Sequence, residues 1–169
     1  CIKASSSKDL AAKALELTSH QHYEAACKIY LRLVETEKKV LSHRELLAET
    51  YIKLHKTDKA IIQLEHICQE YTLLKDYKKA NEGFAKILDL DSSKVIIREL
   101  IADNYVKMEQ IIDAVAELMQ LFDSYINSNS FENAQNIYKK IISLDPENIE
   151  VMSIMSRTCA SNGHRDQAI

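Results

Sequence analysis

The sequence predicts an all-α fold, arranged as a helical-repeat solenoid of about nine antiparallel helices. The chain of 169 residues has only two glycines and one proline, where average usage would give roughly twelve and eight. Helices joined by tight turns need few such residues, whereas sheets and long loops need many. With 46% hydrophobic and 28% charged residues, the chain can bury a continuous core. Together with an internal repeat of about 54 residues, these features indicate stacked helical units.

The repeat consists of aromatic, aliphatic and alanine positions that recur at one constant offset, without a gap. The aligned sets are Tyr23, Tyr77 and Phe131; Ala26, Ala80 and Ala134; Tyr30, Phe84 and Tyr138; Leu47 and Ile101; Tyr51 and Tyr105; and Ala60, Ala114 and Ala168. The offset divides a single domain, residues 1–169, into a partial unit 1–21, complete units 22–75 and 76–129, and a partial unit 130–169. Since both ends fall inside a unit, we expect the chain to be a piece of a longer array.

Each complete unit is predicted to hold three helices. The expected helices span 22–37, 41–55, 57–74, 76–90, 94–108, 110–128, 130–144 and 148–162, with one more in 1–21. Pairs such as Lys75-Asp76 and Asn129-Ser130 supply residues that cap helices or adopt left-handed backbone angles. The break at 109–111 carries no such signal, and only its alignment with 55–57 predicts it.

The spacing of these residues resembles the tetratricopeptide repeat, a two-helix pattern of about 34 residues. One copy reads Leu47-Ala48-x-x-Tyr51 followed by Ala60-x-x-x-Leu64, and its counterpart reads Ile101-Ala102-x-x-Tyr105 followed by Ala114-x-x-x-Leu118. A second pair reads Ile67-Cys68-x-x-Tyr71 followed by Ala80-x-x-x-Phe84, and Leu121-Phe122-x-x-Tyr125 followed by Ala134-x-x-x-Tyr138. These copies overlap, so the helix 57–74 serves as the second helix of one repeat and the first helix of the next.

The resemblance implies a concave face that binds a peptide or helix of a partner protein. Carried over position by position, the family's groove residues become Ser42, Glu45, Glu49, Ile52 and Lys53, then Ile96, Glu99, Asp103, Val106 and Lys107. From the second position onward, both sets read acidic, acidic, apolar, basic. The alternative is that Glu49 with Lys53, and Asp103 with Lys107, are ordinary surface pairs at i, i+4 spacing. Carboxylates in these positions argue against a ligand with an acidic tail.

No catalytic, metal or cofactor site is predicted. Two glycines cannot build a phosphate-binding loop, and no HExxH pair is present; the spacing His20-x-His22 falls in a turn, where solvated histidines are expected. The 22 basic and 25 acidic residues give no positive field for nucleic acid. No apolar run is long enough to insert into a membrane, and the scattered cysteines favour a reducing, cytoplasmic location.

These features predict a non-catalytic scaffold that binds a protein or peptide partner. The alternative is a regulatory or substrate-holding arm of a larger enzyme whose catalytic domain lies outside this sequence. Ends that fall inside repeat units would also allow self-association between copies of the chain.

Overall fold

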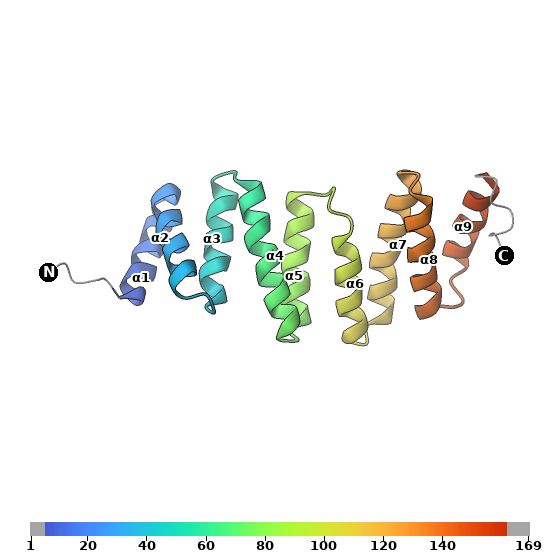
Figure 1. The fold of residues 1–169 in the computed structure, drawn as a ribbon, viewed down its shortest axis with the longest axis horizontal. Helices are drawn as coiled ribbons and strands as arrows, with labels where there is room; N and C mark the ends of the chain where they lie inside the picture. Colours follow the sequence, from blue (N-terminus) through green and yellow to red (C-terminus); the bar gives the residue numbers. More distant parts are fainter. Residues whose placement is uncertain (1–5, 162–169) are drawn as a thin grey trace. The chain divides into compact units, whose positions relative to one another are not determined.

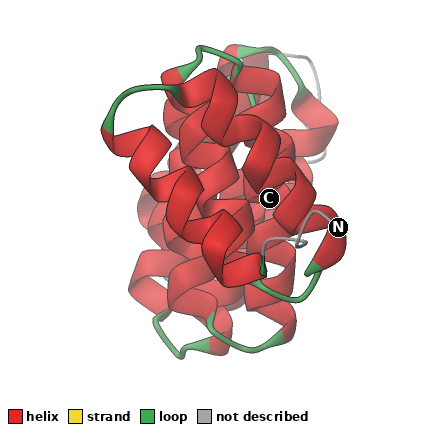
Figure 2. Cartoon of the chain, turned by 90° about the vertical axis from the view of Figure 1, so that its left-hand side faces the viewer, coloured by secondary structure: helices red, strands yellow, loops and turns green. Residues whose placement is uncertain are grey.

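The computed structural model describes residues 6–161, which form nine α-helices and no strand (Figures 1 and 2). The all-α helical repeat predicted from the sequence is confirmed. Contacts divide the chain into two compact units, with the boundary between Asp91 and Ser92. This boundary falls inside the predicted repeat unit 76–129, and the assignment of repeat units remains a prediction.

The first structural unit contains α1 to α5, and each helix packs against the next. Their bounds are α1 Ser7–Ser19, α2 Tyr23–Thr36, α3 Leu41–Lys53, α4 Thr57–Leu73 and α5 Tyr77–Leu90. The first helix starts with a capping box in which the side chains of Ser6 and Asp9 each bond the other's backbone N–H. Fully buried side chains such as Tyr30 and Leu33 form the core between α1, α2 and α3.

The second structural unit contains α6 to α9, again with each helix packed against the next. Their bounds are α6 Ile97–Lys107, α7 Ile111–Asn127, α8 Phe131–Leu144 and α9 Ile149–Ser161. Phe122 and Leu121 of α7, Ile141 of α8 and Val151 of α9 are fully buried at its centre. The predicted helix 148–162 extends one residue beyond the described range.

Five of the turns share one backbone geometry, in which a single residue takes a positive φ. These residues are Gln21, His55, Lys75, Glu109 and Asn129, and none of them is a glycine. At each turn the left-handed residue and the residue after it donate backbone hydrogen bonds to the preceding helix, as in His55 to Ile52 and Lys56 to Tyr51. This is the Schellman motif that ends helices. Glu109 takes the positive φ, so the break predicted at 109–111 is confirmed.

The helix predicted for 94–108 begins three residues late, at Ile97. The amides of its first residues, Ile97, Arg98 and Glu99, donate hydrogen bonds to the carbonyls three residues earlier. Residues 94–96 therefore form turns and not a helix. No side chain caps this helix at Ile96, and the sequence offers none there. The other predicted helices in the described range agree with the structure within two residues at each end.

The alanines that define the repeat lie at the helix contacts and have no exposed surface. This group contains Ala26, Ala60, Ala80, Ala114 and Ala134; Ala168 lies outside the described residues. The cysteines in the described range, Cys27, Cys68 and Cys159, are also buried and form no disulfide with one another, as expected of small apolar side chains. Within residues 6–161, no helix has the length and apolar character needed to span a membrane.

Candidate functional site

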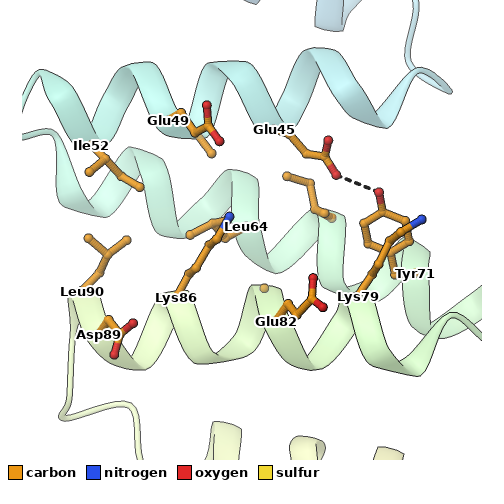
Figure 3. A pocket seen from close by; sticks show the side chains of 13 residues that line it. Glu45, Glu49, Ile52, Leu64, Tyr71, Lys79, Glu82, Lys86, Asp89 and Leu90 are labelled. Carbon is orange, nitrogen blue, oxygen red and sulfur yellow. Dashed lines mark hydrogen bonds between the residues drawn. The ribbon is translucent and has the colours of Figure 1, made fainter.

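A groove of about 710 Å³ opens in the first structural unit, between α3, α4 and α5 (Figure 3). This volume lies within the usual range for ligand sites, roughly 300–1,000 Å³. We call it the α3–α5 groove. The residues that line it are Glu45, Ala48, Glu49 and Ile52 of α3, Leu64, Ile67 and Tyr71 of α4, and Lys79, Glu82, Gly83, Lys86, Asp89 and Leu90 of α5.

The floor of the groove is apolar. Ala48, Leu64 and Ile67 form it and are buried. Ala48 occupies the small-residue position of the repeat. Gly83 contributes no side chain, and a Cβ added at this position would overlap Sγ of Cys68 on α4. The close approach of α4 and α5 thus requires a glycine at position 83, and no side chain projects into the groove from there.

The walls of the groove carry charged side chains from α3 and α5. The hydroxyl of Tyr71 donates a 2.7 Å hydrogen bond to Glu45. Lys79 pairs with Asp76 at 3.0 Å, and its Nζ lies 5.1 Å from the centre of the Tyr71 ring, within the range of a cation–π contact. One end of the groove is thus held by a connected set of polar contacts. Figure 3 shows Glu49, Glu82, Lys86 and Asp89 along the remainder.

The pKa of Tyr71 is raised by this arrangement. Its hydrogen bond to the Glu45 carboxylate and, secondarily, its burial raise the pKa of Tyr71 to about 12. Burial likewise raises the pKa of Tyr51, which belongs to α3, to about 12. Both phenols are neutral at physiological pH, so Tyr71 can donate a hydrogen bond to Glu45.

The free energy of unfolding is expected to fall as the pH rises from about 10 to about 12. Over this range an unfolded tyrosine, with a pKa near 10, has lost its proton while folded Tyr71 still holds it, so the folded chain binds more protons. Tyr71→Phe should remove part of this dependence and leave the part due to Tyr51. The measurement is urea unfolding across alkaline pH, with ring-labelled tyrosine followed by NMR. A Tyr71 that titrates near 10 in the folded protein would contradict the expectation.

Three of the five residues predicted on α3 line the groove: Glu45, Glu49 and Ile52. Lys53 is exposed and is not among the lining residues, and the same holds for Ser42. Within the described residues, the structure shows no ion pair between Glu49 and Lys53. The i, i+4 surface pair considered for these two residues is therefore not formed.

The predicted residues on α6 have a different environment. Nζ of Lys140, on α8, forms an ion pair with Glu99 and lies 3.8 Å from Oδ1 of Asp103. Val106 and Lys107 are exposed on the same helix. The two sets, which look alike in the sequence, therefore differ in the structure: one lines an open groove and the other is bound by a lysine of the chain itself.

Sequence reasoning missed the contribution of α5 and α8, because the resemblance supplied positions on the first helix of each repeat only. A signal was present, since Lys86 and Lys140 occupy equivalent positions in successive copies of the repeat.

His20 and His22 are exposed. Within the part of the chain that the structure describes, no group of three or more His, Cys, Asp or Glu side chains could hold a metal ion.

The comparisons agree with the repeat that the sequence suggested. The tetratricopeptide repeat family matches residues 123–148, which include α8 with Ala134 and Tyr138 and the turn Asp145-Pro146. The resemblance to this family is thereby confirmed. No curated protein matches the sequence significantly.

Several solved structures similar to this chain are tetratricopeptide repeat proteins or domains. TTC0263 of Thermus thermophilus is 13% identical, over 92% of this chain and 100% of that chain, with a TM-score of 0.36. The TPR2AB domain of yeast Sti1, in a complex with pHSP90, is 16% identical over 96% and 73%, with a TM-score of 0.43. YrrB, a protein with an unusual peptide-binding site, is 12% identical over 88% and 91%, with a TM-score of 0.36.

Proposed function

We propose that this chain, a helical array of the tetratricopeptide repeat type, is a non-catalytic scaffold that binds a peptide or helix of a partner protein in the α3–α5 groove. The observation that carries the proposal is the groove itself, with an apolar floor between two charged walls. Apolar floors provide binding free energy, and charged walls select the partner and its orientation.

The residues expected on the concave face of α3 support the same location. Glu45, Glu49 and Ile52 line the groove together with side chains of α4 and α5. Ile52 is half-buried, so a ligand can cover its remaining surface. Cys27, Cys68 and Cys159 are buried and form no disulfide with one another, which supports a reducing compartment that we take to be the cytoplasm.

The test is selection of binders from a random peptide library on the whole chain, followed by NMR of the complex. We expect the selected peptides to shift amide signals of the lining residues on α3, α4 and α5. Ile52→Ser should weaken binding several-fold, because a ligand covers only the surface of Ile52 that the fold leaves exposed, and this is a fraction of the roughly 1.5–3 kcal/mol for burying a whole isoleucine.

The matched control is Ile62→Ser, because Ile62 on α4 is exposed and does not line the groove. Its replacement should leave the affinity unchanged. Failure to select any binder, or signal shifts confined to residues outside the groove, would refute the proposal.

A further inference from the structure

We propose that the α3–α5 groove selects peptides in which a lysine or arginine stands beside a large apolar side chain, whereas the equivalent place on α6 is filled by Lys140 of the chain itself. This inference rests on the proposed function and specifies its ligand. It follows from a comparison of the two copies of the same surface within one chain.

The second structural unit shows which group these carboxylates bind. Glu99 and Asp103 are the counterparts of Glu45 and Glu49 in the next copy of the repeat, and both are within ion-pair distance of the Lys140 ammonium. The hydrogen bond to Glu99 raises the pKa of Lys140, which keeps it charged. A lysine ammonium is therefore the complement of this pair of acidic positions.

In the first structural unit the equivalent lysine does not bind them. Glu45 accepts its hydrogen bond from the neutral Tyr71 hydroxyl, and Lys79 is held by Asp76. Lys86, which aligns with Lys140, lies along the groove (Figure 3). Among residues 6–161, the structure shows no ion pair for the side chains that line the rest of the groove: Glu49, Glu82, Lys86 and Asp89.

The two units also differ in the side chains at the helix contact below these acidic positions. Where the first has Cys68 and Gly83, the second has Phe122 and Ile137, and both are buried. The larger pair belongs to the buried core of the second unit, whereas at the smaller pair α4 and α5 approach so closely that no side chain fits at position 83. The acids on the α5 wall, Glu82 and Asp89, are likewise replaced by the neutral residues Asn136 and Ser143 on α8.

The charge of the groove then determines the ligand. Its lining holds four acidic and two basic side chains, and one of the two basic groups is already paired with Asp76. A cationic side chain is attracted and an acidic peptide is repelled. The apolar floor between Leu64 and Gly83 takes an apolar side chain. Only a ligand with both groups next to each other satisfies wall and floor together.

The experiment compares peptides selected from the random library with variants of the whole chain. We expect enrichment of lysine or arginine next to leucine, isoleucine, methionine or an aromatic residue. For a selected peptide, changing its lysine to glutamine should lower the affinity about tenfold at low salt, and much less at high salt. The double variant E49Q/E82Q should weaken the lysine peptide by a similar factor and should barely affect the glutamine peptide.

The matched control is E99Q/D103N on α6. Asp103 is the counterpart of Glu49, and Glu99 is the counterpart of Glu45. This double variant should leave the affinity unchanged, because Lys140 already occupies both carboxylates. Equal weakening by both double variants would show that the ligand responds to the negative charge of the whole chain and not to the groove, and would overturn the inference. Selected peptides without a basic residue, or binding insensitive to E49Q/E82Q, would also overturn it. If the inference is overturned but Ile52→Ser still weakens binding, the proposed function holds. A library that yields no binder would refute both the inference and the proposed function.

Discussion

Replacing Phe122 by alanine is expected to lower the free energy of unfolding by about 3–5 kcal/mol, the usual cost of truncating a buried phenylalanine. Phe122 has no exposed surface and lies at the centre of the core between α7, α8 and α9. Ala134 and Ile137 of α8 belong to the same core, and α8 is held by its neighbours on both sides. The cavity left behind therefore has little freedom to collapse.

Urea unfolding followed by circular dichroism measures this loss, and hydrogen exchange should show it in α7 and α8. The control is Gln120→Ala on the exposed side of α7, which should change the stability by no more than about 0.5 kcal/mol. A loss below about 1 kcal/mol for Phe122→Ala would mean that α7 does not pack against α8 as described.

Replacing Gly83 by isoleucine, the residue at the equivalent position of α8, is expected to cost about 3 kcal/mol. The first atom of any side chain at this position would overlap Sγ of Cys68, and Cys68 has no exposed surface into which it could move. The better helix propensity of isoleucine recovers only a few tenths of a kcal/mol. The added side chain would also enter the groove, so peptide binding should be lost.

Cys68→Ala provides the decisive comparison, because it removes the sulfur atom that Gly83→Ile would contact. Alone it should destabilise the protein, but in the double variant it should recover about 1–2 kcal/mol of the loss. Ala85→Ile on the exposed side of α5 controls for the change in residue type. Losses that simply add in the double variant would show that the contact between α4 and α5 is not the cause.

The helices could be predicted well from the sequence because the repeat spacing is a local property of the chain. Tyr51 and Ala60 fix the positions of α3 and α4, and their counterparts in the next copy of the repeat fix α6 and α7. The same alignment found the turn at Glu109, which residue type alone did not indicate. The start of α6 could not be found in this way, since the three turn residues before Ile97 continue the apolar pattern of a helix.

The groove could be predicted only in part, because its shape depends on contacts between helices. Positions carried over from the family identified Glu45, Glu49 and Ile52 on α3. They could not show that Tyr71 binds Glu45, nor that Lys140 reaches from α8 to Glu99, since both contacts join different helices. The role of Gly83 was hidden for the same reason, because it depends on how closely Cys68 approaches.

The Schellman turns at His55 and Lys75 have a consequence for the thermodynamics of recognition. Both turns lie within the segment α3 to α5, and each is closed by two backbone hydrogen bonds. The walls of the groove are thus joined by connections of fixed geometry, whereas the longer connections at 37–40 and 91–96 lie outside it. A partner that binds in the groove as proposed would meet a preorganised surface, and little of its binding free energy would be spent on ordering the receptor. Affinity in such a case depends mainly on the conformational entropy that the ligand itself gives up.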